Sequence, residues 1–571
     1  MAPAMALGVA CAPRVDPPVR PAKARAAASW PLRVKLAPAF LSPGLPNRRP
    51  LPSFPRGRAK SCKPVAAPCH ARRAPVLTCL NPSFATRMNY TLFGFVVLYL
   101  LGTLALGIYA GTRVKNTTDF AVAGRGLPLA MVITTTFATW FGAETVMGLP
   151  AKFIQGGLGA VVEDPFGASF CLILVGLFFA SRLYKMSLLT IGDFYRQRFG
   201  KGVEIFCSVA IILSYLGWVA AQITALGVVF SVLSQGEISE TAGMIGGTLA
   251  VLVYVVIGGF LAVAWTDFIQ MIVLVIGLGV IAFFANDLAG GTDKVMALAS
   301  SKDMWTVFPQ AGGLTEWATF VAAAITMMLG SIPQQDVFQR VMSAKDADTA
   351  RRGAVIGGFS YLLFAFVPMF IVCCAVVVMG EQALDLAKND YQRLLPSFIM
   401  GHMPLAMQIL FFGALLSAIK STSSATLLAP STSFVENILK HIRPGLTDRQ
   451  QLLAMRITIL VFSISVLAYA IKMKGTSIYE LVSSAYQVTL VAAFVPLAFG
   501  VYWKRATTQG AVASIAAGSV VWVASFPQLL GFGEAFPGQL AGLLAAIVGM
   551  VAGSLAPQWL ADKRELQSRL A

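Results

Sequence analysis

One apolar stretch of the sequence contains a group of hydroxyl side chains that could bind a cation. It reads Ser417-Ala-Ile-Lys-Ser-Thr-Ser-Ser424 and lies in the middle of a long hydrophobic run. Sodium is a hard cation that prefers about five oxygen ligands, which hydroxyls and backbone carbonyls can supply. The alternative is structural, because Ser and Thr in membrane helices also hydrogen-bond to their own helix or join neighbouring helices. The stretch therefore indicates either an alkali-cation site or a packing motif.

A lysine, Lys420, interrupts the same stretch. A charged side chain inside a bilayer is costly and is by default a functional residue. Its ammonium could replace a bound cation, which would produce a proton-coupled or uncoupled carrier. It could instead pair with a carboxylate, for which the candidates are Glu144, Asp164 and Asp336. On a helix Lys420 lies nearly opposite the face that bears Ser421 and Thr422, which favours the ion pair.

The sequence lacks the residue sets that covalent catalysis in a membrane would need. The histidines His70, His402 and His441 lie outside the centres of the apolar runs. No zinc motif and no Gly-x-Ser-x-Gly elbow occurs at such a centre, so a membrane-embedded hydrolase is disfavoured. Four cysteines lie in apolar runs and predict packing residues rather than a disulfide framework: Cys171, Cys207, Cys373 and Cys374. We expect no metal other than sodium.

The composition excludes a soluble enzyme. Of the 571 residues, 57% are hydrophobic and only 12% are charged, whereas a soluble protein has roughly a quarter of its residues charged. The net charge of +18 is uneven, because residues 1–87 hold 15 of the 44 Lys and Arg residues and one acid, Asp16. The remaining 29 basic and 25 acidic residues leave a net charge of only +4 from Met88 onward. A nucleic-acid partner is therefore not expected.

Apolar runs of about 20 residues, each ended by a short polar or Gly/Pro-rich link, repeat from Asn89 onward. Such runs cross a bilayer as helices, so the sequence predicts an all-α multi-pass membrane protein of about thirteen spans. The predicted spans are 89–111, 127–153, 160–181, 202–234, 241–262, 265–286, 316–339, 353–379, 403–438, 451–471, 478–501, 509–530 and 537–556. The loops after spans 1, 3, 7, 9 and 11, with the C-terminal tail, hold 20 Lys and Arg residues, whereas the opposite loops hold seven. The N-terminus of the first span is therefore predicted outside and the C-terminus inside.

Residues 1–87 form a leader of different composition. They are rich in Ala, Pro and Arg, hold 16 of the 30 prolines, and have no apolar run long enough for a signal-peptide core. Such a segment cannot bury a core and fits an organelle transit peptide, which would place the protein in a plastid envelope rather than the plasma membrane. A retained tail and a misassigned start at Met88 are the alternatives. A retained tail with 15 basic residues would lie on the side that the charge rule disfavours.

Two of the predicted spans contain residues that break helices. The second span includes Phe137-Ala-Thr-Trp-Phe-Gly-Ala-Glu-Thr-Val-Met-Gly-Leu-Pro150, and the seventh includes Met327-Met-Leu-Gly-Ser-Ile-Pro-Gln-Gln-Asp336. Transporters bind solutes and ions near the midplane at such breaks, where backbone groups become free to act as ligands. The interval of five spans predicts two five-helix units, spans 2 to 6 and 7 to 11, related as an inverted repeat.

Several strings resemble those of one transporter family. Gly258-Gly-Phe-Leu-Ala-Val-Ala-Trp-Thr-Asp267, followed by Gln270, resembles the signature of the sodium:solute symporter family. Met147-Gly-Leu-Pro150 is similar to its proline/sodium symporters, and Ala138-Thr-Trp-Phe-Gly142 and the segment 332–341 are similar to its choline branch. The matches extend from the first span to about Arg505. The resemblance implies a LeuT-type inverted-repeat fold and secondary transport coupled to sodium.

The resemblance also implies a set of sodium ligands. They are the backbone carbonyls of Ala138, Phe141 and Ala418 and the hydroxyls of Ser421 and Thr422. Residues 418, 421 and 422 share one face of a helix, so they could approach the same ion. Asp267, at the end of the signature, is expected to be structural and to hold the short turn between spans 5 and 6.

The solute pocket is expected between spans 2, 4, 7 and 11. Trp140 and Trp218 fall where the family has aromatic substrate contacts, and two tryptophans could enclose a quaternary ammonium group. Packing or interfacial anchoring is the alternative for each. Gln334 stands where the choline branch has a further aromatic residue, so the substrates of the relatives do not transfer to this chain.

Polar residues near the breaks are further candidates for the pocket. Glu144 could bind a cationic or amine-bearing solute, or it could pair with Lys420. Possible gate or substrate contacts in span 11 are Ser483, Ser484, Tyr486 and Gln487. The turn Glu163-Asp164-Pro165 at the entrance to span 3 is expected to be surface-exposed.

These observations predict a sodium-driven symporter of a small polar organic solute that works by alternating access. We expect a secondary transporter rather than an enzyme, embedded in a lipid bilayer, with a monomer as the functional unit. Two alternatives remain open. One is a proton-coupled or uncoupled carrier that uses Lys420, and the other is a solute-gated channel or sensor with a transporter fold.

Overall fold

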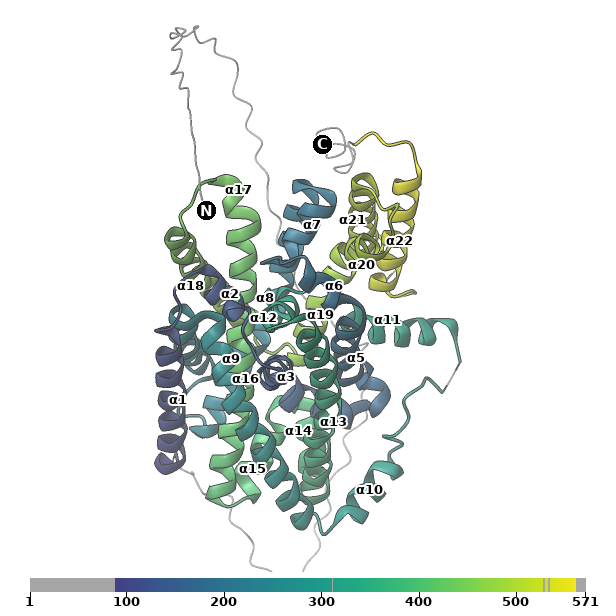
Figure 1. Cartoon of the computed structure of the whole chain (residues 1–571). Coiled ribbons are helices and arrows are strands. Elements are labelled where there is room, and N and C mark those ends of the chain that lie inside the picture. The colour runs from purple at the N-terminus through teal and green to yellow at the C-terminus, as the bar shows by residue number, and fades with distance from the viewer. Residues whose placement is uncertain (1–87, 311, 527–528, 532, 534, 561–571) are drawn as a thin grey trace, which may run out of the picture. The chain divides into compact units, whose positions relative to one another are not determined.

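The computed structural model describes residues 88–560 except 311, 527, 528, 532 and 534. The described residues all belong to one compact unit. The predicted leader therefore lies outside the described residues. The described part of this unit is built from helices (Figure 1), and its extended pairing is limited to one isolated bridge between Leu127 and Ala344.

Long apolar helices occupy the positions of the predicted spans. Nine helices of the described chain are long and apolar enough to cross a membrane, and one bent pair raises that number to ten. In chain order, the elements that coincide with predicted spans are α1 (Tyr90–Gly111), α3 (Leu129–Trp140) with α4 (Leu149–Gly156), α5 (Ala168–Leu174) with α6 (Ala180–Lys185), α8 (Lys201–Leu233), α9 (Glu240–Leu288), α11 (Leu314–Gly330) with α12 (Gln335–Ser343), α13 (Ala347–Met379), α16 (Leu405–Phe434), α18 (Asp448–Lys472), α19 (Ile478–Thr489) with α20 (Val495–Tyr502), α21 (Thr508–Ala524) and α22 (Gly538–Leu555). A multi-pass helical membrane protein is confirmed, whereas the number of thirteen crossings stays a prediction.

The helix α9 combines the predicted spans 5 and 6. Its 49 residues would extend about 74 Å if straight, more than twice the hydrocarbon thickness of a bilayer. The backbone turns at Gly259, where φ is 53° and ψ is −155°, a conformation that favours glycine. A side chain there would also meet the ring of Phe120 at 2.5 Å. The bend therefore falls at Gly259, and the predicted link at residues 263–264 is wrong by a few residues.

Both predicted helix breaks are present. The helix α3 ends at Trp140, Phe141 leaves helical geometry with φ −88° and ψ 70°, and the chain resumes through η2 (Glu144–Gly148) and α4. In the seventh span, α11 and α12 meet at a bend of 45°. Pro333 lies in the gap between them, where its missing N–H and its effect on the preceding residue oppose a continuous helix.

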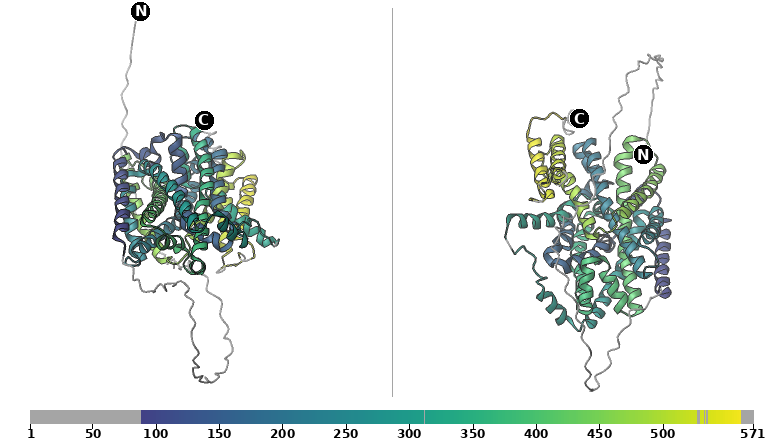
Figure 2. Two further views of the ribbon diagram at one scale, coloured as in Figure 1. Left: turned by 90° about the horizontal axis from the view of Figure 1, so that it is seen from below. Right: turned by 180° about the vertical axis from the view of Figure 1, so that it is seen from behind.

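The helix α16 lies at the centre of the contacts among these elements. It packs against α9, α8 and α3, among others, and every side chain from Ala414 to Ser433 is buried. By contrast, α1 and α18 have only 22% of their apolar windows buried, as expected for helices that face lipid. Two views show α21 and α22, coloured yellow-green and yellow, packed side by side (Figures 1 and 2). Polar chemistry is therefore concentrated around α16 and the two breaks.

Candidate cation and solute site

Two hydroxyls of α16 reach across to the broken end of α3. Ser421 Oγ lies 3.1 Å from the carbonyl oxygen of Ala138, and Thr422 Oγ1 lies 3.5 Å from the same oxygen. Ala418 lies one turn earlier on the same face of α16 and is also buried. The fold thus brings together the α3 carbonyl and the α16 hydroxyls of the predicted sodium site, directly before the break at Phe141.

The neighbouring hydroxyls of the same stretch follow the structural alternative. Ser417, Ser423 and Thr426 donate to carbonyls four residues earlier in α16, at 2.8, 2.6 and 2.8 Å, and Ser424 donates to the carbonyl of Lys420. These bonds satisfy the hydroxyls within their own helix. The stretch therefore contains hydroxyls that face α3 and hydroxyls that bond to their own helix, and only the structure distinguishes the two groups.

A carboxylate borders the predicted sodium ligands. Asp267 is fully buried, and its Oδ1 lies 2.6 Å from Ser421 Oγ while its Oδ2 accepts from Thr135 Oγ1 at 2.6 Å. It stands eight residues beyond the bend at Gly259, inside the second part of α9. The expectation that Asp267 holds the turn between spans 5 and 6 is wrong, because that bend forms earlier in the chain.

Lys420 points away from the hydroxyls that face α3. Its Nζ donates to Thr103 Oγ1 of α1 at 2.7 Å and lies 4.2 Å from the ring centroid of Tyr254 in α9. The expected ion pair with Glu144, Asp164 or Asp336 is wrong, since none of the described ion pairs includes Lys420. A hydroxyl and an aromatic ring replace the carboxylate because Lys420 faces α1 and α9 rather than the breaks.

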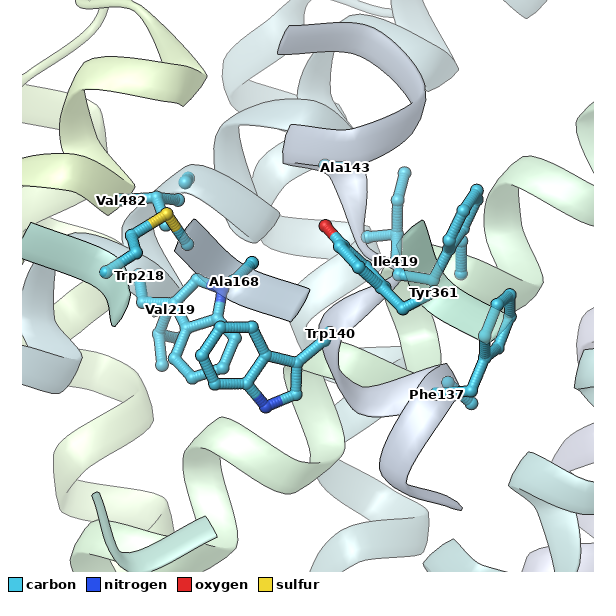
Figure 3. Close-up of a cluster of buried hydrophobic side chains, with 14 of the residues drawn as sticks. Phe137, Trp140, Ala143, Ala168, Trp218, Val219, Tyr361, Ile419 and Val482 are labelled. Carbon is cyan, nitrogen blue, oxygen red and sulfur yellow. The ribbon is translucent and has the colours of Figure 1, made fainter. Parts of the chain in front are cut away.

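Three aromatic side chains pack against one another beside the first break, and this cluster is called the cage below. Trp140 stacks on Tyr486 with ring centroids 5.9 Å apart, and Trp218 lies 5.7 Å from Trp140 and 5.5 Å from Tyr486. In Figure 3 the rings of Trp140 and Trp218 lie against each other next to the first break. All three side chains are at most 1% exposed. Trp140 Nε1 and the Tyr486 hydroxyl have no hydrogen-bond partner among the described residues.

Glu144 supplies a carboxylate to the wall of this cage. Its Oε1 accepts from Trp218 Nε1 at 2.9 Å and its Oε2 from Gln222 Nε2 at 2.5 Å. Gln222 in turn accepts the backbone N–H of Ala143 at 3.0 Å, which fixes the chain just after the break. Glu144 is 2% exposed and takes part in none of the described ion pairs. The arrangement suits a cationic group placed near the aromatic rings.

The second break contributes neutral and charged groups behind the cage. Gln334 Nε2 donates to Ser214 Oγ at 2.9 Å, and Asp336 Oδ1 accepts from the Tyr215 hydroxyl at 2.5 Å. Tyr215 stacks on Trp218 with centroids 6.1 Å apart, so α12 is linked to the cage through one ring. Gln487 lies elsewhere, because its Oε1 accepts from Trp522 of α21 at 3.3 Å.

Arg340 is buried, contrary to its predicted place in an inner loop. It is 2% exposed, its Nη1 donates to the carbonyl of Asp336 at 2.8 Å, and its guanidinium lies 5.0 Å from the centroid of Phe260. The helix α12 continues to Ser343, which carries Arg340 into the protein. The inner loops therefore hold one basic residue fewer than the sequence indicates.

Glu163 and Asp164 are also buried rather than surface-exposed. They belong to η4 (Val162–Gly167), which packs against α11, and they are 6% and 1% exposed. Both carboxylate oxygens of Glu163 lie 2.7 Å from Ser483 Oγ in α19. Asp164 Oδ1 accepts from the Tyr361 hydroxyl of α13 at 2.6 Å. The segment after Gly157 folds into helical turns under α19 and α13, so it forms no exposed loop.

Sequence reasoning did not identify three residues of this region. Gln222 and Tyr361 are single polar residues in apolar runs, and nothing in their neighbours signals which break they face. Arg340 stood at the end of a predicted span, where a basic residue is expected to lie in the loop. The burial of Arg340 could have been recognised only once the bend in α9 and the bend between α11 and α12 were known.

Comparisons with known proteins agree with this arrangement. The family described as the sodium:solute symporter family matches residues 120–518. The human high affinity choline transporter 1 is 28% identical over 443 residues, which cover 75% of this chain and 75% of the relative. The high-affinity proline transporter PutP of Bacillus subtilis is 28% identical over 464 residues, covering 77% and 94%. The sodium/pantothenate symporter of Escherichia coli is 25% identical over 481 residues, covering 81% and 97%.

Solved structures show the same fold. A Na+-coupled sialic acid symporter in a substrate-bound outward-open state has a TM-score of 0.70 at 21% identity, covering 82% of this chain and 98% of the symporter. The nucleobase-cation-symport-1 family transporter Mhp1, in a closed conformation, has a TM-score of 0.52 at 15% identity, covering 76% and 93%. With a family match over well more than half of its length, the chain belongs to the sodium:solute symporter family, and it is a sodium-coupled secondary transporter with a LeuT-type fold.

Proposed function

We propose that the solute carried with sodium by this transporter is a small organic cation or an amine-bearing molecule. One observation carries the proposal: Glu144, buried in the wall of the cage of Trp140, Trp218 and Tyr486, is paired with no cationic side chain among the described residues. A buried carboxylate without a counter-charge is unfavourable. A cationic group stacked on the rings would gain cation–π attraction and would neutralise the carboxylate. Choline, the solute named for several relatives, is such a cation.

We propose that sodium is held at the break of α3 by the carbonyls of Ala138 and Phe141 and by Ala418, Ser421 and Thr422 of α16. The hydroxyls that face the Ala138 carbonyl support this assignment. Asp267 adds a negative charge next to Ser421, which would stabilise a monovalent cation through its field and through the orientation of that hydroxyl. No divalent cation is required by this donor set.

The alternative that Lys420 replaces sodium has less support. Its ammonium is directed to Thr103 and Tyr254, away from Ser421 and Thr422. If Lys420 is not part of ion coupling, sodium-dependent uptake should persist in a Lys420→Met variant, which keeps a long apolar side chain. Uptake in this variant that no longer depends on sodium would favour the alternative.

The experiment that tests the solute class is uptake into proteoliposomes with and without an inward sodium gradient. The panel contains choline and primary amines as cations, proline and betaine as zwitterions, and monocarboxylates and urea. Accumulation of cations above their external concentration, only with the gradient, is expected, and it would also exclude a channel or sensor, which cannot concentrate solute. Gradient-driven accumulation of the neutral or anionic solutes alone would contradict the proposal.

We further propose that residues 1–87 act as a transit peptide for a plastid envelope and that the carrier of residues 88–571 works as a monomer. The acid-poor, Arg-rich composition of the leader supports this destination. A fusion of residues 1–87 to a fluorescent protein should enter plastids, whereas plasma-membrane localisation of the full chain would contradict it. Mass photometry of the purified carrier would measure its oligomeric state.

A further inference from the structure

A second group of buried carboxylates lies next to the cage. Glu163 and Asp164 of η4 contact α19 and α13, as described above, and the backbone N–H of Asp164 donates to the Tyr479 hydroxyl at 3.3 Å. Tyr479, Ser483 and Tyr486 recur every three to four residues of α19 and so share one face. The acidic pair therefore contacts the same face of α19 that contributes Tyr486 to the cage, about one to two helical turns away.

The two acidic regions are also joined through hydrogen bonds. The Tyr361 hydroxyl connects Asp164 Oδ1, at 2.6 Å, with Thr145 Oγ1, at 2.8 Å. Thr145 follows Glu144 directly in the chain and donates to the carbonyl of Trp140 at 3.2 Å. The path from Asp164 to the cage thus contains one tyrosine and one threonine, without an intervening apolar layer.

The acidic pair is buried and has no ion-pair partner among the described residues. Asp164 Oδ2 is buried and has no hydrogen-bond partner among the described residues. Glu144, Glu163 and Asp164 are absent from every described ion pair, and Glu144 and Glu163 both act electrostatically on Asp164. Lys152 attracts the Glu163 carboxylate, but this attraction is weaker than the effect of the hydrogen bond from Ser483. Isolated buried carboxylates are unfavourable, so a positive partner is expected from outside the protein.

One inorganic ion does not fit both regions. Among the described residues, no group of three or more His, Cys, Asp or Glu side chains converges as metal ligands. The carboxylates instead stand at two separate positions: Glu144 is bonded to Trp218 and Gln222 of α8, whereas Glu163 and Asp164 are bonded to Ser483 of α19 and Tyr361 of α13. Two separate acidic centres match a ligand with two separate positive centres, and the aromatic rings beside Glu144 suit an apolar chain between those centres.

We propose that the solute is an aliphatic diamine or polyamine, with one ammonium group at Glu144 and the aromatic cage and a second at Asp164 and Glu163. The inference rests on the proposed function, since it assumes that organic cations are transported with sodium. The methylene chain would lie against the rings of the cage, and the second ammonium would supply the missing partner of Asp164 Oδ2.

The test compares two solutes that differ in one ammonium group, putrescine and n-butylamine, in sodium-driven proteoliposome uptake. An ammonium–carboxylate contact contributes a factor of about 10 to 100 in affinity. Wild type should therefore have a KM for putrescine at least about tenfold below that for n-butylamine. Asp164→Asn, which keeps the size of the side chain, should bring the two values together by weakening putrescine alone. Glu163→Gln should act in the same direction, and the exposed Asp293→Asn should leave the ratio unchanged.

Several results would overturn the inference. They are equal KM values for both amines in wild type, an unchanged ratio in Asp164→Asn, and equal loss of both substrates in a variant that still elutes as a folded monodisperse protein. If Asp164→Asn does not fold, the wild-type ratio and Glu163→Gln decide the question. Failure of every cationic solute to accumulate would refute the proposed function itself, whereas uptake of n-butylamine or choline without any preference for diamines would refute only this inference.

Discussion

Replacement of Ser421 by alanine tests the cation site most directly. Ser421 Oγ lies 3.1 Å from the Ala138 carbonyl and 2.6 Å from Asp267 Oδ1, so the substitution removes one proposed ligand and the hydroxyl that orients Asp267. Losing a charge-assisted contact of this kind costs about 1.5–3 kcal/mol. At about 1.4 kcal/mol per factor of ten, the sodium concentration for half-maximal uptake should rise about 10- to 150-fold.

Ser423 provides the matched control two residues away in the same helix. Its hydroxyl donates to the carbonyl of Ile419 at 2.6 Å and has no described hydrogen bond to α3. Ser423→Ala should lower the stability by about 0.5–1.5 kcal/mol, the usual contribution of one hydrogen bond, but should change the half-saturating sodium concentration by less than about threefold. The assay is initial uptake of a transported solute against sodium concentration, at constant ionic strength. Equal shifts in the two variants, or no shift in Ser421→Ala, would refute the assignment of sodium to this face of α16.

Three further changes give separate predictions. Glu144→Gln should raise the KM for cationic solutes about tenfold or more, because it removes the carboxylate charge and places a second amide against Gln222, whose amide donates to the Glu144 carboxylate in the wild type. Unchanged uptake kinetics would argue against a role of Glu144 in solute binding. Gly142→Ala should abolish transport, since the added methyl would lie 2.5 Å from Glu144 Oε2 and 2.7 Å from Thr422 Oγ1, and wild-type uptake would show that the break opens more widely than described. Glu204→Ala should lower the thermal unfolding temperature in detergent, because the fully buried carboxylate accepts from Asn437 at 2.9 Å and His441 at 2.7 Å. Breaking such a buried charged contact costs about 3–5 kcal/mol. An unchanged unfolding temperature would contradict the packing of α8 on the end of the ninth predicted span.

Much of the architecture could be predicted from the sequence, because the requirement that every backbone group be satisfied in lipid leaves helices as the main choice. The apolar runs marked the helices, and Gly142 and Pro333 marked the two breaks. The division of α9 was less predictable. The pair Gly258-Gly259 is present in the sequence, but glycine is frequent in membrane helices, so the pair alone does not predict a bend. Only the close approach of Phe120 to Gly259 shows why the bend falls there.

The details of the site depended on contacts between distant segments. Helical angles correctly separated Lys420 from Ser421 and Thr422, since that relation is local. The partner of Lys420 could not be found in the same way, because Thr103 lies 317 residues earlier in the chain. Glu163 and Asp164 were misjudged for a similar reason: acidic residues before a proline are typical of a turn, and their burial results from α13 and α19, which come much later.

The position of Gly142 has a consequence for the energetics of transport. Glu144 Oε2 and Thr422 Oγ1 both border the space where a side chain of residue 142 would lie, so a carboxylate proposed for the solute and a hydroxyl proposed for sodium are separated by one residue without a side chain. Two cations bound there would repel each other unless Glu144 and Asp267 screen them. Binding free energies obey reciprocity, so the factor by which sodium changes the affinity for solute must equal the factor by which solute changes the affinity for sodium. The cooperativity between sodium and solute therefore depends on how far the negative charges near Gly142 offset the repulsion between the two bound cations.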